Sequence, residues 1–493
     1  MIYNFNLGIG WASSGVEYAQ IYRARMFRNI GVDAKFVFTD MFPSENMEHM
    51  TKNIGFLDSE VIWLYTFFTD FKTAPVTYSL SDLEKTFTDL NYTKTREGKI
   101  CRYVFGGSNN FYTAYMVNDH DDFVHRVEMV SNGFLIRKDY FTYGRVYSEY
   151  YAPLDNKAHL YHRRFFNENG SVAYEEIIDN DRVMYKFKDK ILCSKEEFVG
   201  YMVSQLNLTS DDVVLIDRST DIGQSIIMNC KPARVGTVVH ADHFSEKDTN
   251  EDYILWNNFY EYEFNMHKHI DFYICSTQAQ SDLMVQQFEK YYGVTPCVYT
   301  IPVGSLPELK YPKENRKPFS LITASRLASE KHVDWICKAV IQARSEVPEL
   351  SLDIYGEGGE KSKLETIIRD NNASSYIHLM GQHDLSEVYQ NYEAYIAGST
   401  SEGFGLTLME AVGGGLPIIG FDVRYGNPTF IRNGENGYLI DLPEEDSDRI
   451  EALRKGIVDL FKQDLEKCHS VSYEVAKDFL TSNVQEKWRE AVC

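Results

Sequence analysis

No stretch of about 18 consecutive apolar residues occurs in this 493-residue sequence, so the pattern of a membrane-spanning helix is missing. The first ten residues, M-I-Y-N-F-N-L-G-I-G, also lack the basic and apolar regions of a secretory signal. We therefore expect a cytoplasmic protein that associates at most peripherally with the inner face of the cell membrane.

Basic residues are few relative to acidic ones, with 50 Lys and Arg against 72 Asp and Glu and a formal net charge of −22. No Lys/Arg run is dense enough to reverse this charge locally, so nucleic acid is not an expected partner. An anionic ligand would need a few placed cations and backbone N–H groups.

The eight cysteines are scattered, with no C-x-x-C pair and no close Cys/His cluster, so neither a disulfide framework nor a zinc site is expected. Aromatic residues, in contrast, are abundant at 14%, with 34 Tyr and 30 Phe. Tyrosine suits both the buried face of a sheet and a surface that binds carbohydrate or peptide, and composition alone leaves both roles open.

The first 39 residues predict the β-α-β opening of a doubly wound parallel sheet. A strand over residues 2–7 is followed by Gly8, Gly10 and Gly15, then by a helix over 16–31 and a strand over 34–39. The spacing of these glycines differs from the G-x-G-x-x-G dinucleotide fingerprint, which disfavours NAD.

Between residues 75 and 193 short alternating aromatic and polar runs predict an inserted antiparallel β-meander. The α/β pattern resumes at Lys195, includes an aromatic-rich helix near 252–268, and reaches a linker at Pro302. A second α/β unit and a last helix over 473–492 follow. We thus expect an α/β protein with two doubly wound Rossmann-like domains facing a cleft, divided as 1–74 and 194–303 (N-terminal domain), 75–193 (insertion), 304–472 (C-terminal nucleotide-sugar-binding domain) and 473–493 (a helix returning to the N-terminal domain).

Two motifs in the second unit carry chemistry. In S-E-G-F-G-L-T-L-M-E-A, residues 401–411, Glu402 and Glu410 flank a strand-to-helix turn whose N–H groups suit an anion, and carboxylates suit sugar hydroxyls. In A-S-R-L-A-S-E-K, residues 324–331, Arg326 and Lys331 follow a strand end and could neutralise a diphosphate. Taken singly, these are also ordinary capping or surface residues.

Together with Y-G-E-G-G-E-K-S-K-L-E, these motifs resemble the retaining glycosyltransferases of family 4, which have the GT-B fold, across residues 320–440. The resemblance implies that Arg326 and Lys331 bind the donor pyrophosphate, that Glu402 contacts the transferred sugar, and that Glu410 binds the ribose. It further implies a donor phosphate contact at Gly15 and a catalytic position for His240, although a packing glycine and a structural histidine are open alternatives. The remaining implied donor-binding residues are Gln382, His383, Phe404, Gly405, Leu406 and Thr407.

The resemblance implies retention by front-face attack without an enzymatic nucleophile, and catalysis without a metal. Asp179-Asn180-Asp181 matches the D-x-D pattern of metal-dependent glycosyltransferases, but its position between two apparent strands favours a hairpin turn.

The N-terminal M-I-Y-N-F-N and the inserted meander resemble family 4 members of the accessory Sec system, which attach N-acetylglucosamine to serine-rich repeat adhesins. That resemblance implies UDP-GlcNAc as donor, a Ser/Thr-rich adhesin polypeptide as acceptor, and a related non-catalytic subunit as partner. Two alternatives stay open: the chain is itself the binding-only subunit, or it extends a glycan, teichoic acid or lipid-linked acceptor.

Overall fold

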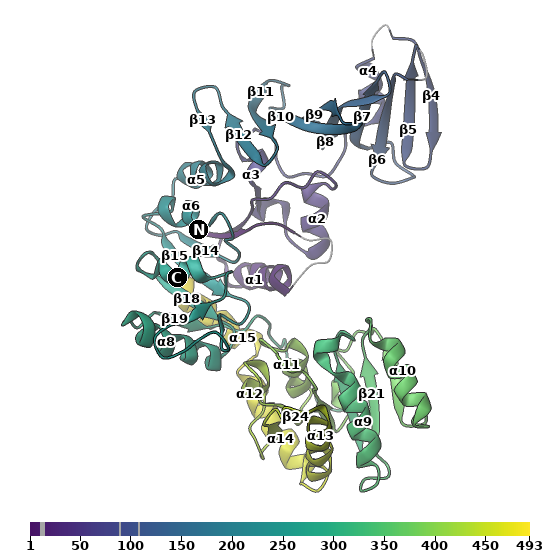
Figure 1. The fold of residues 1–493 in the computed structure, drawn as a ribbon, viewed down its shortest axis with the longest axis vertical. Helices are drawn as coiled ribbons and strands as arrows, with labels where there is room; N and C mark the ends of the chain where they lie inside the picture. Colours follow the sequence, from purple (N-terminus) through teal and green to yellow (C-terminus); the bar gives the residue numbers. More distant parts are fainter. Residues whose placement is uncertain (10–14, 88–89, 107–108) are drawn as a thin grey trace. The chain divides into compact units, whose positions relative to one another are not determined.

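The computed structural model describes residues 1–9, 15–87, 90–106 and 109–493, in two compact units (Figure 1). Unit 1 comprises Met1–Thr237 and Asn258–Asp271, and unit 2 comprises Val238–Asn257 and Phe272–Cys493. Gly10 and the four residues after it, part of the predicted glycine-rich turn, lie outside the described residues. None of the helices in the described ranges combines the length and apolar content of a membrane span.

Unit 1 contains a parallel sheet in the order β15-β14-β1-β2-β3. Its central strand β1 pairs in parallel with both β2 and β14, and all four residues of β14 are buried, as expected for a strand between helical layers. The predicted β-α-β opening is confirmed, since α1 connects β1 to β2. The strands are β1 (Ile2–Asn6), β2 (Ala34–Phe38), β3 (Val61–Trp63), β14 (Val213–Ile216) and β15 (Arg234–Val239); the helices are α1 (Gly15–Ile30), α2 (Met47–Ile54), α3 (Leu64–Phe67), α4 (Leu80–Lys85), α5 (Lys195–Gln205), α6 (Gly223–Asn229) and α7 (Glu261–Asn265).

A buried ion pair fixes α1 on this sheet. Arg23 Nη2 lies 2.7 Å from Asp217 Oδ1, and Gln20 Nε2 donates to Asp217 Oδ2 at 2.8 Å. Asp217 directly follows β14, so the pair joins the helix after the glycine-rich turn to the carboxyl end of a neighbouring strand. Desolvating such charges is costly unless they are paired and hydrogen-bonded, which makes this contact specific to one helix position.

The predicted meander is a ten-stranded antiparallel sheet whose strands follow one another in chain order (Figure 1). Asp179 ends β11, Asn180 has a φ of 53°, and β12 begins at Arg182, so the predicted hairpin turn at the D-x-D segment is confirmed. The strands are β4 (Tyr92–Glu97), β5 (Ile100–Phe105), β6 (Phe111–Met116), β7 (Val124–Ser131), β8 (Phe134–Phe141), β9 (Arg145–Leu154), β10 (Lys157–Phe166), β11 (Val172–Asp179), β12 (Arg182–Lys186) and β13 (Ile191–Leu192).

A row of stacked rings crosses four strands of this sheet. The ring centroids of Tyr140 and Tyr147 are 4.3 Å apart, those of Tyr147 and Phe165 are 5.4 Å apart, and those of Phe165 and Tyr174 are 4.5 Å apart. None of these four side chains is more than 4% exposed. The tyrosines of this row therefore build the core of the insertion.

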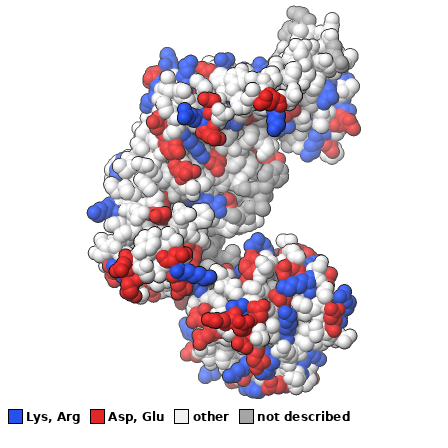
Figure 2. Space-filling model, viewed as in Figure 1, with Lys and Arg blue, Asp and Glu red and all other residues white. Residues whose placement is uncertain are grey.

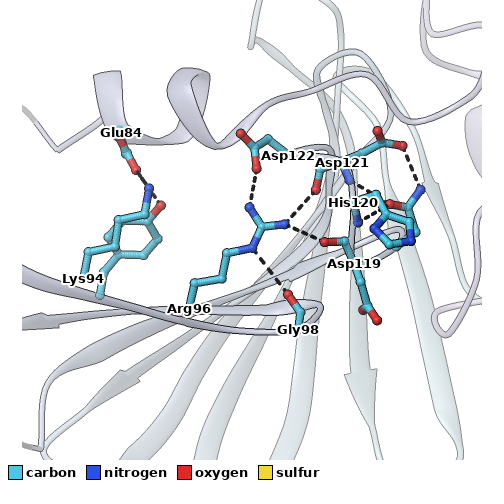
Figure 3. A network of polar contacts seen from close by, with 10 residues as sticks. Glu84, Lys94, Arg96, Gly98, Asp119, His120, Asp121 and Asp122 are labelled. Carbon is cyan, nitrogen blue, oxygen red and sulfur yellow. Dashed lines mark hydrogen bonds and ion pairs between the residues drawn. The ribbon is translucent and has the colours of Figure 1, made fainter.

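Edge strand β4 is exposed along its whole length and is held by charged contacts (Figure 3). Lys94 Nζ lies 2.6 Å from Glu84 Oε1 of α4, and Arg96 Nη1 lies 2.5 Å from Asp122 Oδ1. Arg96 also donates to carbonyl oxygens in the β6–β7 connection. Charged side chains on an exposed edge disfavour pairing with further strands.

Unit 2 contains a six-stranded parallel sheet in the order β22-β21-β20-β23-β24-β25. Its strands are β20 (Ser320–Ala324), β21 (Ser351–Tyr355), β22 (Ile377–Gly381), β23 (Ala394–Ile396), β24 (Ile418–Phe421) and β25 (Gly437–Ile440). Its helices are α9 (Val333–Ala343), α10 (Lys361–Asp370), α11 (Leu406–Gly413), α12 (Gly426–Phe430), α13 (Asp446–Leu460), α14 (Leu465–Lys477) and α15 (Thr481–Val492). Unit 2 also holds the hairpin of β16 (Phe244–Ser245) and β17 (Leu255–Trp256), and the parallel strands β18 (Phe272–Cys275) and β19 (Val298–Thr300), which flank α8 (Gln278–Tyr292).

One helix prediction is wrong, and a second is wrong in its continuity. The aromatic-rich segment 252–268 contains β17, the short helix α7 and the start of a 3-10 turn at His267–His269, because Trp256 is buried opposite Phe244 in the β16–β17 hairpin. The last predicted helix, 473–492, is instead α14 and α15, because Thr481 N donates to Leu306 O at 2.9 Å and the chain turns there. Tertiary pairing overrides helix propensity at both places.

Candidate functional site

The two motifs lie at the point where the strand order of the unit 2 sheet reverses. β20 and β23 are neighbours, and the connections that follow them carry Arg326 and Glu402 respectively. In open α/β sheets ligands bind beyond the carboxyl ends of strands at such a switch point. The two motifs therefore lie at the sheet edge where this fold class binds ligands, and their ligand roles stay predictions.

Lys331 and Glu402 form a direct ion pair at this edge. Lys331 Nζ lies 2.6 Å from Glu402 Oε2, and the side chains are 19% and 21% exposed. Partial burial weakens screening by water, so this pair is stronger than a fully exposed one. A cation predicted to bind diphosphate and a carboxylate predicted to bind the sugar are thus within contact of each other.

The loop that carries Glu402 is fixed by its backbone and leads into α11. Glu402 O accepts hydrogen bonds from Tyr425 N at 2.6 Å and from Gly426 N at 2.7 Å. Gly405, with a φ of 86°, precedes the helix, and a Cβ there would lie 2.6 Å from a methyl carbon of Leu408. The opening N–H groups of α11 have no intrahelical acceptor by geometry, so this turn suits a phosphate or sugar oxygen.

Arg326 is held by its backbone while its side chain extends into solvent. The side chain is 80% exposed, and Nη2 lies 3.1 Å from Glu330 Oε1. The chain on either side of it packs against the Y-G-E-G-G loop, where a Cβ on Gly356 would lie 1.9 Å from Ser325 O. The glycine requirement of that motif is thus explained by close packing against the Arg326 loop.

Glu410 lies in the second turn of α11 and accepts a hydrogen bond from Tyr389 Oη at 3.0 Å. Protein atoms that displace water from the carboxyl raise its pKa, and the hydrogen bond from Tyr389 opposes this shift. The residue keeps an open side toward solvent, whereas Tyr389 is 3% exposed. Glu410 is therefore a positioned carboxylate that can still accept hydroxyl hydrogen bonds from a ligand.

A second buried tyrosine joins the two motifs. Tyr395 Oη lies 2.9 Å from Ala324 O, at the end of β20, and 3.1 Å from Thr407 Oγ1 in α11. Burial raises the pKa of Tyr395 to about 12, so the phenol stays protonated and donates a hydrogen bond at neutral pH.

Four other predicted residues have different surroundings. The Phe404 ring packs against Phe430 at 5.3 Å and is buried, so only its backbone can face a ligand, whereas the Leu406 side chain is exposed. Gln382 and His383 follow β22, and His383 Nε2 lies 2.8 Å from Met380 O.

His240 also lies at this site, whereas His243 is a core residue. A Cβ on Gly403 would be 4.0 Å from His240 O, which places His240 beside the Glu402 loop. His243 is fully buried, its Nε2 lies 2.7 Å from Gln287 Oε1, and burial lowers its pKa to about 4. Gly15 is the first residue of α1 in unit 1 and is exposed.

Sequence patterns missed Tyr389, Tyr395, Tyr425 and Asp242. Tyr425 follows β24, and its Oη donates to Asp242 Oδ1 at 2.5 Å although 183 residues separate the two. Motif spacing gives no signal for partners this distant; only the strand order and the buried positions of the tyrosines identify them.

Two family models match this chain, one within the ten-stranded sheet and one within unit 2. Residues 93–189 match the GtfA extended beta-sheet domain, and residues 308–478 match the glycosyl transferases group 1 family. The GtfA subunit of a UDP-N-acetylglucosamine–peptide N-acetylglucosaminyltransferase from Streptococcus agalactiae is 52% identical over 492 residues, which is 99% of this chain and 97% of that protein.

Two crystal structures resemble the whole chain. A chain in a GtfA/B complex is 51% identical with a TM-score of 0.95, covering 100% of this chain and 99% of that one. The pneumococcal O-GlcNAc transferase GtfA in complex with UDP and GlcNAc is 49% identical with a TM-score of 0.84, covering 100% of this chain and 98% of that one.

Proposed function

Because the chain belongs to the GtfA family of peptide N-acetylglucosaminyltransferase subunits, we propose that it transfers N-acetylglucosamine from UDP-GlcNAc to Ser and Thr hydroxyls of a serine-rich repeat adhesin before export. The identity extends over the insertion as well as the donor-binding unit, which supports a shared acceptor class as well as a shared donor. The alternative of a glycan, teichoic acid or lipid-linked acceptor is not favoured.

The observation that carries this function is the Lys331–Glu402 ion pair in front of α11. A UDP-sugar presents a diphosphate next to sugar hydroxyls, and here a cation, a carboxylate and helix N–H groups lie side by side. Lys331 and Arg326 would bind the diphosphate, and the exposed Arg326 side chain can reach it by rotation about its own bonds. Glu402 would accept hydrogen bonds from the sugar.

The other predicted residues complete the donor site. Glu410, positioned by Tyr389, would accept hydrogen bonds from the ribose hydroxyls. The backbone at Gln382 and His383 would contact the base, the backbone from Phe404 to Thr407 would contact sugar and phosphate oxygens, and Gly15 would lie against the phosphate. His240, beside the Glu402 loop, would contact the reacting sugar.

In the proposed reaction the acceptor hydroxyl attacks the anomeric carbon on the face that the diphosphate leaves. The new C–O bond forms as the bond to the diphosphate oxygen breaks, and the hydroxyl proton passes to the departing diphosphate, with retention of configuration. Positive charge aimed at the leaving group stabilises this transition state more than the bound substrate, which is the source of catalysis. The two cations and the N–H groups of α11 supply that charge, so we propose that no metal is required.

The ten-stranded sheet is the proposed contact region for the acceptor polypeptide and for a related non-catalytic subunit, since the GtfA/B structure is a complex of two subunits. Intact donor residues support the catalytic role for this chain over the binding-only one. Acidic and basic side chains are interspersed on the face shown in Figure 2, which favours neither nucleic acid nor an anionic membrane as partner.

We propose the cytoplasm as the compartment of the reaction. Nucleotide sugars are cytoplasmic metabolites, and all eight cysteines of the chain are free thiols, as expected in a reducing compartment.

The test uses the full chain with its partner subunit, a panel of UDP-sugars and a Ser/Thr-rich polypeptide, and measures added sugar by intact mass. We expect additions of N-acetylglucosamine only, unaffected by a chelator. If no sugar nucleotide gives either transfer or donor hydrolysis, the proposal that the chain is an enzyme is wrong. If a chelator abolishes transfer, the proposal that no metal is required is wrong.

A further inference from the structure

Tyr425 connects the segment that carries His240 to the loop that carries Glu402. On one side its Oη donates to Asp242 Oδ1 at 2.5 Å and lies 3.3 Å from His243 Nδ1. Asp242 and His243 are the second and third residues after His240. The Tyr425 side chain is 2% exposed, so these contacts are shielded from water.

The backbone of the same residue holds Glu402. Tyr425 N donates to Glu402 O at 2.6 Å, and the neighbouring Arg424 O accepts from Glu402 N at 3.2 Å. Glu402 and Tyr425 form an isolated parallel bridge outside the named strands. Displacing Tyr425 therefore displaces the main chain from which the Glu402 carboxylate projects.

We propose that Tyr425 is a positioning residue that sets the distance and angle between His240 and Glu402 around the reacting sugar. The proposal rests on the site roles given under the proposed function. His240 and Glu402 come from chain segments about 160 residues apart, so their relative position needs a tertiary connection. The buried Tyr425 phenol and a pair of backbone hydrogen bonds supply that connection. Transition-state contacts to a sugar tolerate little misplacement, since an error of about 1 Å costs about 100-fold in rate.

The groups around the phenol favour a single arrangement. Burial, together with the Asp242 charge, raises the pKa of Tyr425 far above its ordinary value, so the phenol remains a donor. Asp242 is the charged acceptor at the shorter distance, and Arg424 Nη2 lies 3.5 Å from its Oδ2 and 3.2 Å from Glu246 Oε2. His243 is anchored on its other side by Gln287. A phenol with a charged acceptor, a fixed histidine and a tethered backbone has little freedom to shift.

Most contacts proposed for UDP depend on other elements. Arg326 and Lys331 follow β20, and Glu410, the proposed ribose ligand, is positioned by Tyr389. The ion pair of Lys331 with Glu402 joins one of these contacts to the Glu402 loop. Loss of the Tyr425 phenol should therefore slow the chemical step far more than it weakens UDP binding, which separates positioning from a general loss of the site.

The experiment compares Tyr425→Phe with Tyr392→Phe in the complex of the full chain and its partner subunit. Tyr392 is a matched control, because its buried Oη donates to the Asp353 carboxylate at 2.7 Å, away from His240 and Glu402.

We expect Tyr425→Phe to lower kcat for transfer by about 10-fold to 100-fold. The KM for UDP-GlcNAc and the Kd for UDP should stay within about twofold, because contacts made only in the transition state do not contribute to ground-state binding. Tyr392→Phe should keep the wild-type kcat.

A second variant tests the coupling itself. Asp242→Ala should lower kcat at least as much as Tyr425→Phe, because it also removes the contact with Arg424. The double variant should be no slower than Asp242→Ala, since both changes remove the same hydrogen bond. Wild-type kcat in folded Tyr425→Phe, additive losses, or a parallel loss of UDP affinity would each overturn the proposal.

Hydrogen exchange measured by mass spectrometry distinguishes failure of the Tyr425 proposal from failure of the proposed function. Tyr425→Phe should speed exchange in both segments, 240–246 and 400–405, and Tyr392→Phe in neither. If the wild type transfers no sugar, the proposed function fails, and unchanged exchange in these segments would independently refute the bridge.

Discussion

Lys331 Nζ lies 2.6 Å from Glu402 Oε2, so the cation proposed for the diphosphate and the carboxylate proposed for the sugar hold each other. The lysine belongs to the connection after β20 and the glutamate to the connection after β23, and only the strand order brings them together. The ion pair therefore restricts the positions of both side chains in the absence of substrate.

Removing the charge of Lys331 should affect catalysis more than folding. We expect Lys331→Met to lower kcat by about 100-fold or more, because a cation near the departing diphosphate is lost. Lys331→Met with Glu402→Gln should be less than additive, as their side chains share one contact. Lys338→Met, which removes the ion pair of the exposed Lys338 with Asp334, is the control and should leave kcat unchanged. Equal kcat values for all these variants would contradict the roles proposed for Lys331 and Glu402 in the donor site.

Glu410 should show opposite effects on stability and on donor binding. Its pKa is raised in the folded chain, so the folded state holds the proton more tightly than the unfolded state, and this contribution to stability is lost as pH rises through the raised pKa. At neutral pH Glu410→Gln should therefore raise the melting temperature while weakening UDP binding.

The pH dependence of UDP affinity gives the companion test for Glu410. As pH falls, the carboxyl should become protonated above the ordinary value of 4.5 and lose capacity to accept a ribose hydrogen bond. Calorimetric titration should show affinity falling over that range in the wild type, and a much flatter profile in Glu410→Gln. The same fall in both proteins would contradict the ribose role.

The sequence predicted those features whose signals are local. The hairpin at Asn180, the helix start after Gly405 and the strand ends before Arg326 and Glu402 depend on turn chemistry and periodicity within about ten residues. The hydrogen bond between Tyr425 and Asp242 spans 183 residues and has no local signature. Likewise, the helix predicted near 252–268 failed because the pairing of Trp256 with Phe244 is a tertiary contact.

Gly356 should not tolerate substitution, although no ligand contact is proposed for it. A methyl group there would lie 1.9 Å from Ser325 O and would push the loop that carries Arg326. We expect Gly356→Ala to weaken UDP binding by about 10-fold or more, since about 1.4 kcal/mol of lost contact corresponds to a factor of ten. Gly359→Ala is the matched control, because its Cβ would meet no atom within 4 Å. Calorimetry on both variants decides, and equal affinities would refute the packing argument.

Arg163 should be essential to the ten-stranded sheet because it separates two buried carboxylates. Its Nε lies 2.9 Å from Glu149 Oε1 and its Nη1 lies 2.7 Å from Glu176 Oε2, and these carboxylates are 3% and 2% exposed. Arg163→Met would leave both acids buried without their cation, which should destabilise the chain by about 3–5 kcal/mol.

The next residue along β10 supplies the control for Arg163. Arg164 pairs with Glu175 at 3.1 Å, but its side chain is 44% exposed, so water screens the pair and Arg164→Met should cost at most about 1 kcal/mol. Urea unfolding of both variants, followed by hydrogen exchange of strands β9 to β11, measures the difference where it arises. Similar losses would mean that burial does not govern these pairs, whereas a large loss for Arg163→Met alone would show that the sheet depends on one buried cation held between two acids.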